Sequence, residues 1–300
     1  MADYGILEGA IDLHVHAAPD LYKRPYSELE VSRAAEAAGY RAILFKSHFA
    51  INADRASVIN EVLGGRVKVF GGITLNHPVG GFNPIAVLAA IGLGAKEIKM
   101  PTIHAAHHME VSGPTYSYFD EKLPPRFIDL EGISVLDEKG KLKKEVYEVL
   151  EVIHHEDVFL GTGHLSYSEL KVLIPEARRL GVERIQVTHA ESLYSYLTVE
   201  QQQEFAALGA IIEHQLSRCM PVYLRGKEGK LEPEEIFNNI RKVGAERCTL
   251  ATDFGQLFNP HPVDGFRMVV RIMIKCGMTD AELDWLIRKN PARLLGLGRA

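Results

Sequence analysis

The stretch Ile11-Asp12-Leu13-His14-Val15-His16, near the N-terminus, decides how the chain is interpreted. Apolar and polar residues alternate along it, and successive side chains of a β-strand point to opposite faces. We therefore expect a strand whose polar face carries Asp12, His14 and His16. Two imidazoles two residues apart on a strand can reach one metal ion. The alternative is a half-buried strand whose histidines only pack or form hydrogen bonds, so the rest of the chain must decide.

Short apolar runs alternate with amphipathic helical patterns along nearly the whole chain. Repeated strand–helix units of this kind predict an α/β fold with parallel strands. Their number favours a single (β/α)8 TIM barrel over an open doubly wound sheet. The predicted strands are residues 10–16, 40–47, 67–75, 95–101, 157–163, 184–189, 210–214 and 248–253. The predicted helices are residues 27–38, 54–63, 84–93, 143–154, 168–179, 199–208, 233–243 and 264–275.

No linker divides the sequence, so we expect one domain over residues 1–300. The longest irregular region, about 102–141, is an insertion after the fourth predicted strand. A loop of this length inside a compact domain is usually a lid or a binding element, and an oligomer contact is the alternative. An extra C-terminal helix is predicted to start near Met278-Thr279-Asp280, and the run Asn290-Pro291-Ala292-Arg293-Leu294-Leu295-Gly296 follows it.

The composition argues against several classes of protein. The 34 Lys and Arg residues and 39 Asp and Glu residues give a formal net charge of −5, too small to indicate a nucleic-acid partner. No apolar run reaches the ~18 residues of a membrane span, and the first residues lack the pattern of a signal peptide. Three widely spaced cysteines fit a reducing compartment. We therefore expect a cytoplasmic protein with a small-molecule substrate and no membrane partner, and leave a homo-oligomer open.

In a parallel barrel, the chemistry lies at the C-terminal ends of the strands. Metal-binding or ionisable side chains end nearly every predicted strand, so we expect them to meet at one rim. In strand order these residues are His14 and His16, Lys46 and His48, Asn76 and His77, Lys99, His164, His189, Glu213 and His214, and Asp253.

This set resembles the amidohydrolase superfamily of metal-dependent hydrolases over almost the full length. That family has H-x-H at strand 1, Lys or Glu at strand 4, His at strands 5 and 6, and Asp at strand 8. Those positions are filled here by His14, His16, Lys99, His164, His189 and Asp253. Residues 290–296 resemble the N-P-A-x-x-L-G run that commonly closes such barrels. Within the superfamily, residues 80–84 and 100–102 resemble an uncharacterised branch of predicted hydrolases.

The resemblance implies one or two divalent metal ions, zinc being the simplest choice. It implies that the more buried ion is held by His14, His16 and Asp253, and the second by His164 and His189. Lys99 would bridge the two ions as an N-carboxylated lysine, because a plain ammonium cannot ligate a cation. The alternative is an unmodified Lys99 that binds substrate or pairs with Glu97, which leaves a one-metal site.

The implied reaction is hydrolysis of an amide, cyclic amide, ester or lactone. A metal-bound hydroxide would attack the carbonyl, and Asp253 would act as general base. A metal-dependent decarboxylase or a phosphoesterase on the same barrel is an alternative, although Lys99 and the segment Ala17-Ala18-Pro19-Asp20 argue against these. A non-catalytic barrel that binds a metal or a small molecule is a third hypothesis.

Two further residues at the predicted rim, Lys46 and His48, are candidates for substrate contact. Both could bind an anionic or carbonyl group, and Lys46 is also a candidate catalytic residue. The alternative for Lys46 is an ion pair with Asp12 or Glu213.

The remaining rim residues have weaker signals. Asn76 and His77 could line the pocket or shape a turn before Gly80 and Gly81. His214, at strand 7, is a candidate catalytic residue. Three histidines follow strand 4 in the long loop, where a surface position competes with substrate contact or a lid role; they are His104, His107 and His108.

Overall fold

The structure is a computed structural model that describes residues 5–113, 130–156, 158–215, 217–220 and 231–298. In that part of the chain, no helix is both long and apolar enough to cross a membrane. The strands are β1 (Ile11–Val15), β2 (Ala42–Phe45), β3 (Lys68–Phe70), β4 (Gly72–Thr74), β5 (Glu97–Lys99), β6 (Phe159–Gly161), β7 (Ile185–Val187), β8 (Ile211–Gln215) and β9 (Cys248–Ala251).

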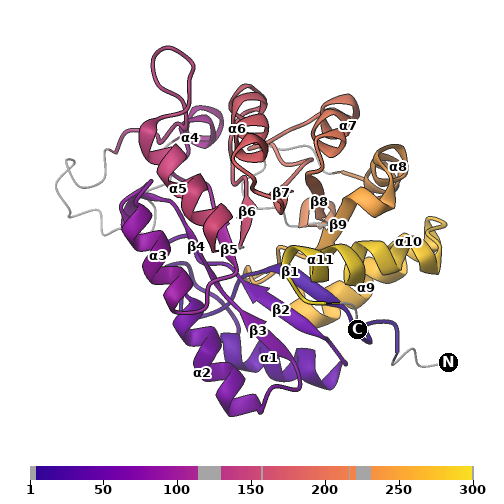
Figure 1. Ribbon diagram of the computed structural model, residues 1–300. Coiled ribbons are helices and arrows are strands. Elements are labelled where there is room, and N and C mark those ends of the chain that lie inside the picture. Colours follow the sequence, from indigo (N-terminus) through magenta and orange to yellow (C-terminus); the bar gives the residue numbers. More distant parts are fainter. Residues whose placement is uncertain (1–4, 114–129, 157, 216, 221–230, 299–300) are drawn as a thin grey trace.

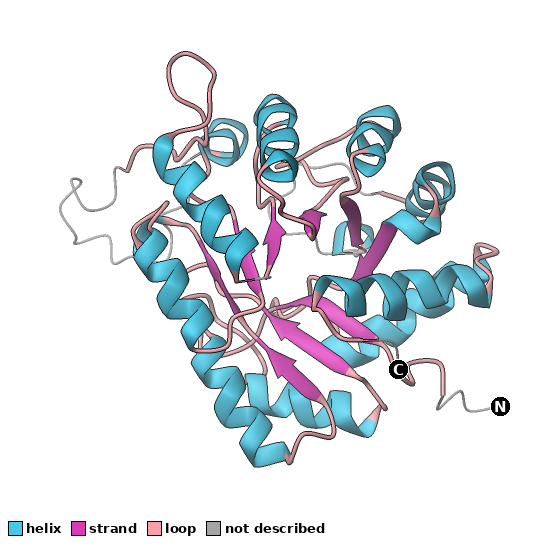
Figure 2. Cartoon of the chain, in the orientation of Figure 1, coloured by secondary structure: helices cyan, strands magenta, loops and turns pink. Residues whose placement is uncertain are grey.

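Helices surround the strands, as Figures 1 and 2 show for α2, α3, α5, α6, α7 and α8. Capping boxes fix several helix starts; Ser27 and Glu30, for example, exchange hydrogen bonds at the start of α1. The helices are α1 (Glu28–Ala37), α2 (Ala53–Leu63), α3 (Pro84–Gly92), α4 (Ala106–Ser112), α5 (Lys144–His155), α6 (Tyr167–Arg179), α7 (Val199–Ala207), α8 (Pro233–Val243), α9 (Pro262–Lys275), α10 (Asp280–Asp284) and α11 (Asn290–Leu294).

All the paired strands run parallel, in the order β1-β2-β3 in one sheet and β4 to β9 in the other. Gly71 separates β3 from β4, so the strand predicted at 67–75 is divided in two. A Cβ on Gly71 would lie 2.6 Å from the carbonyl oxygen of Asn52, whose side chain accepts a hydrogen bond from Gly72 N at 2.7 Å. The loop before α2 therefore crowds this strand, which explains both the glycine and the break.

Backbone hydrogen bonds place the last strand beside the first. Asp253 N donates to His14 O at 2.9 Å, and His16 N donates to Phe254 O at 2.8 Å. Gly255 follows with φ 125°, and a Cβ there would collide with the carbonyl oxygen of His16. The α/β class and the parallel strands are confirmed. The described strands are assigned to two separate sheets and do not form one continuous sheet. Full closure of the barrel therefore stays a prediction.

The C-terminal segment packs against the N-terminal ends of the strands. A π-helical turn, Trp285–Lys289, joins α10 to α11. Asn290 Nδ2 donates to the carbonyl oxygen of Cys248, the first residue of β9, at 2.7 Å. One buried cluster unites strand residues with this segment; its members are Ile11, Leu13, Ala42, Leu44, Phe159, Ile211, Ala292, Leu294 and Leu295. The predicted 290–296 run thus covers the end of the strands away from the rim.

Much of the predicted insertion at 102–141 lies outside the described residues. A parallel bridge joins Ala105, just before α4, to Ile133, which follows the undescribed residues. After Ile133, Leu136 and Leu142 form an antiparallel bridge, and Val135 is fully buried. The described parts are therefore packed against the hydrophobic core, and a lid role for the insertion stays a prediction.

Candidate metal centre

Three predicted ligands converge where β1 and β9 end. His14 Nε2 and His16 Nε2 lie 3.3 and 3.1 Å from the Oδ1 atom of Asp253, and both imidazoles are buried. One nitrogen or oxygen atom from each of the three residues lies within 4.8 Å of the others. The structure therefore brings together the residues predicted to hold the more buried metal ion.

The strand that carries the two histidines is irregular. The register of β1 against β2 shifts between Asp12 and Val15. The carboxylate of Asp12 accepts hydrogen bonds from Thr252 Oγ1 at 2.7 Å and from the backbone N of His14 at 3.1 Å. Asp12 therefore ties β1 to the residue that follows β9, and it lies outside the ligand groups found among the described residues. A single polar face shared by Asp12, His14 and His16 stays a prediction.

Glu213, on β8, orients two histidines of the site. Its Oε1 atom lies 3.0 Å from His14 Nδ1, and its Oε2 atom accepts a hydrogen bond from the backbone N of His189 at 3.1 Å. Burial raises the pKa of Glu213 to about 7. In its ionised form this carboxylate can only accept, so that Nδ1 of His14 then carries the proton and Nε2 keeps its lone pair. Nε2 of His14 is buried without a hydrogen-bond partner among the described residues. This is the arrangement expected of a metal-ligating histidine, and Glu213 itself lies close enough to join His14 and His189 around an ion.

Two of the predicted ligands have left-handed backbone conformations. His189 has φ 58° and Asp253 has φ 53°, and each follows its strand by two residues. Non-glycine residues adopt this conformation rarely, and it persists where the surroundings impose it, often at functional sites. The strained backbone at these two positions therefore supports a functional role for both side chains.

His164 lies near His189 but outside the groups of three ligand atoms found among the described residues. The two ring centroids are 4.9 Å apart. His164 Nδ1 is 2.7 Å from Nδ1 of His108 on α4, and the His164 ring stacks on Tyr194. Its Nε2 atom is buried and has no hydrogen-bond partner in the described part of the chain. A second metal ion held by His164 and His189 stays a prediction.

Lys99 forms a buried ion pair with Glu97, with 2.8 Å between Nζ and Oε1. Both side chains are almost inaccessible to solvent. This is the alternative that leaves a one-metal site, and it engages the nitrogen that carboxylation would modify. A bridging, carboxylated Lys99 stays a prediction.

Burial keeps the histidines of the site in their neutral form. Burial first, and then the Lys46 and Lys99 cations, hold the pKa of His14 well below its usual value. Burial raises the pKa of Asp253 to about 6, although Lys46 and Arg24 oppose that shift. The pKa is also held well below its usual value, chiefly by burial, for His16, His164 and His189. Neutral imidazoles with a carboxylate suit zinc and related divalent ions, so these donors fit a transition metal.

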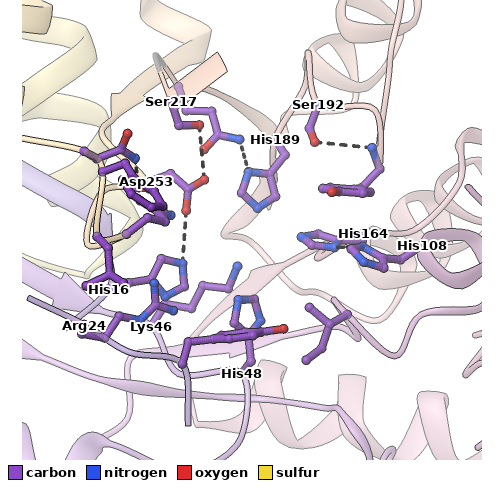
Figure 3. Close-up of a pocket in the computed structure, with 18 of the residues that line it drawn as sticks. His16, Arg24, Lys46, His48, His108, His164, His189, Ser192, Ser217 and Asp253 are labelled. Atoms are coloured by element: carbon purple, nitrogen blue, oxygen red, sulfur yellow. Dashed lines mark hydrogen bonds and ion pairs between the residues drawn. The ribbon is translucent and has the colours of Figure 1, made fainter. Parts of the chain in front are cut away.

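A cavity of about 360 Å³ opens beside these ligands, and Figure 3 shows the side chains that line it. Lys46 and His48 line it, as predicted for substrate contacts. His48 Nδ1 lies 2.8 Å from Thr102 Oγ1. Burial and the nearby Lys99 ammonium lower the pKa of Lys46 to about 7. Among the described residues Lys46 forms no ion pair, so its predicted pairing with Asp12 or Glu213 is absent.

Three other predicted contacts do not line this cavity. Asn76 Nδ2 donates to the backbone O of His48 at 3.0 Å and to Thr102 Oγ1 at 2.9 Å, so Asn76 holds two loops together. His77 and His104 line a separate cavity of about 740 Å³, where their ring centroids are 5.0 Å apart. These three residues therefore act, at most, at the edge of the site.

His214 lies outside the cavity, on the other side of β8 from Glu213. Its Nδ1 atom lies 2.7 Å from Glu191 Oε1, and both side chains are buried. Burial alone would lower the pKa of His214, but Glu191 and Cys248 raise it to about 10. The predicted catalytic role of His214 finds no support in this position, because the imidazolium is part of a buried ion pair.

Sequence reasoning gave two residues of the site no specific role. Glu213 was placed at the rim together with His214, but alternation alone does not say which of two neighbours on a strand faces the rim. His108 was one of three loop histidines for which a surface position competed with substrate contact. Arg24 gave no signal, because the segment after β1 is not periodic, yet it lines the cavity with Nε bonded to Asp20 Oδ2 at 2.7 Å.

Comparison with solved structures shows the fold of amidohydrolases. An amidohydrolase from Pseudomonas aeruginosa matches with a TM-score of 0.64 and 12% identity, over 98% of this chain and 97% of that one. The probable dipeptidase PvdM from the same organism matches with a TM-score of 0.64 and 12% identity, over 98% and 96%. A zinc-bound amidohydrolase from Burkholderia multivorans matches with a TM-score of 0.55 and 13% identity, over 96% and 99%. The resemblance to the amidohydrolase superfamily is thus confirmed at the level of the fold.

A family profile described as "Family of unknown function (DUF6282)" matches residues 9–213. The chain belongs to this family, which agrees with the predicted uncharacterised branch. No curated protein matches the sequence.

Proposed function

We propose that this protein is a metal-dependent hydrolase of the amidohydrolase type, which cleaves an amide, cyclic amide, ester or lactone. The observation that carries the proposal is the convergence of His14, His16 and Asp253 beside a cavity, in a chain with the amidohydrolase fold. A divalent metal ion held there, zinc being the simplest choice, would activate water and polarise the carbonyl.

Each residue has a distinct part in this proposal. His14 and His16 would hold the ion through nitrogens that burial keeps unprotonated, and Glu213 keeps His14 in the required orientation. Asp253, with its pKa of about 6, is mostly ionised at neutral pH and can accept a proton from the attacking water. Ser217 Oγ donates to Asp253 Oδ2 at 3.3 Å, which helps to orient this general base. Asp253 would then pass the proton to the leaving group.

The wider expectations form part of the same proposal. They are a single closed barrel over residues 1–300, a small-molecule substrate, and no nucleic-acid or membrane partner. A second ion at His164 and His189, a homo-oligomer and a cytoplasmic location stay predictions.

The variant Asp253→Asn tests the assignment of the general base. It removes the basic oxygen while keeping the shape, so we expect kcat/KM to fall by about 10² to 10⁴ with the melting temperature little changed. The measurement is turnover of a panel of amides, cyclic amides, esters and lactones by the zinc-loaded protein. Carboxylic acids and phosphoesters are added to the panel to test the decarboxylase and phosphoesterase alternatives. Turnover confined to those last two classes would contradict the proposal, and so would an Asp253→Asn protein that remains fully active.

A further inference from the structure

Lys46 is a buried cation for which the proposed hydrolysis has no use. The residue is 5% exposed and follows β2 directly, and Figure 3 shows its side chain extending toward the middle of the cavity. Within the described ranges, its ammonium has no ion-pair or hydrogen-bond partner. Buried lysines are almost always paired, because an ammonium that loses its hydration needs a counter-charge. The cavity therefore contains a position suited to an anion.

The charges around the cavity define that anion further. Arg24 is neutralised by Asp20 through the 2.7 Å bond between Nε and Oδ2. Asp253 is the one carboxylate among the described lining residues, and its Oδ1 atom lies 3.3 and 3.1 Å from the neutral imidazoles of His14 and His16, with no ion pair to Lys46. Among the described lining residues, Lys46 is therefore the lysine that is both buried and without an ion-pair partner, whereas Lys23 is exposed. A single ammonium balances a monoanion, whereas a dianionic phosphate group would need more donors.

The rest of the lining is largely apolar or aromatic. Ile103, Leu257 and Phe258 contribute to it, together with the ring of Tyr22. A cavity of about 360 Å³ with such walls has the size and character of a small-molecule site. The ligand should therefore combine a compact apolar body with one negative charge.

We infer that the substrate carries a carboxylate in addition to the carbonyl group that is cleaved, and that the ammonium of Lys46 binds this carboxylate. The inference rests on the proposed function, which supplies the cleaved group. Lys46 is thus a specificity-determining residue: it distinguishes a monocarboxylate from its neutral analogue. It lies next to His16 and His48, so the bound carboxylate would be placed within reach of the metal centre.

Benzoate and its neutral isostere benzamide are suitable probes, measured by calorimetry on the metal-free and the zinc-loaded protein. At pH 6, where Lys46 with its pKa of about 7 is mostly protonated, the metal-free wild type should bind benzoate about tenfold or more tightly than benzamide, because the hydrogen bond is charge-assisted. Lys46→Met should abolish the preference and leave benzamide affinity unchanged, whereas Lys46→Arg should retain part of it. Lys23→Met, at an exposed lysine of the same cavity, is the matched control and should keep the preference.

Equal affinity of the metal-free wild type for both probes would overturn the inference, as would an undiminished preference in Lys46→Met. Tighter binding of inorganic phosphate than of benzoate would overturn it too. If Lys46→Met does not fold, the wild-type comparison and Lys46→Arg decide on their own. A benzoate preference without turnover of any carbonyl compound would contradict the proposed hydrolase while leaving the anion site established, so the two failures are distinguishable.

Discussion

A single carboxylate determines which nitrogen of His14 is available to an ion. Glu213 bonds Nδ1 of His14 and the backbone of His189, so one side chain positions two candidate ligands. Partners of this kind fix the tautomer and orientation of ligating histidines. His189 and Asp253 both have left-handed backbone conformations, which further restrict where these two side chains can lie. At the scale of residues, the site therefore depends as much on the groups that orient the ligands as on the ligands themselves.

The substitution Glu213→Gln tests this orienting role. It keeps the size of the side chain but weakens the hold on His14 Nδ1, so we expect zinc affinity to fall by about 10- to 100-fold. Competition with a chromophoric chelator measures the affinity. Glu246→Gln, at a largely exposed side chain, is the matched control and should bind zinc like the wild type. A Glu213→Gln protein with wild-type affinity would show that Glu213 does not orient the ligands.

At the scale of elements, β8 presents two different chemistries on its two faces. Glu213 belongs to the site, whereas its neighbour His214 forms an ion pair with Glu191, away from the cavity. The sequence marks both residues equally as candidates for the site. Alternation shows that the two side chains point to opposite faces of the strand, but it does not show which of these faces belongs to the site. The register of β8 against β9, which pairs Glu213 with Thr249, is a tertiary fact that periodicity does not contain.

The ion pair between His214 and Glu191 makes a contribution to stability that depends on pH. The folded pKa of His214, about 10, lies above its usual value of 6.5. The contribution is therefore complete below pH 6.5 and is lost as the pH rises toward 10. Replacing Glu191 with Gln leaves a buried imidazole without its counter-charge and should cost about 3 kcal/mol at pH 7.

Denaturant titrations of the wild type and Glu191→Gln, between pH 6.5 and 9.5, measure this effect. The stability difference between the two proteins should shrink steadily as the pH rises, because only the wild type loses the ion pair. Glu246→Gln again serves as the exposed control, with no such trend. A difference that is constant over the whole range would show that His214 is not held as an imidazolium.

At the scale of the whole molecule, the order of strands and helices follows from the sequence. The repeated apolar runs match the strand order, and the residues at their ends include His14, His16 and Asp253, which the structure brings together. Periodicity did not reveal the break at Gly71 or the register shift in β1. Both lie where segments distant in sequence meet: Asn52 contacts Gly72 at the break, and Asp12 at the register shift bonds Thr252. The pairing of Lys99 with Glu97 was an open alternative for a different reason: the two residues share one face of β5, and the sequence does not show whether Lys99 pairs along its own strand or turns to a ligand.

The metal content of the purified chain tests the central claim most directly. Protein prepared without chelators and supplied with zinc should retain about one or two equivalents of divalent metal per chain after dialysis. The double variant His14→Ala, His16→Ala should retain far less while its circular dichroism spectrum stays that of the wild type. Substoichiometric metal in the wild type, or equal metal in both proteins, would contradict the account.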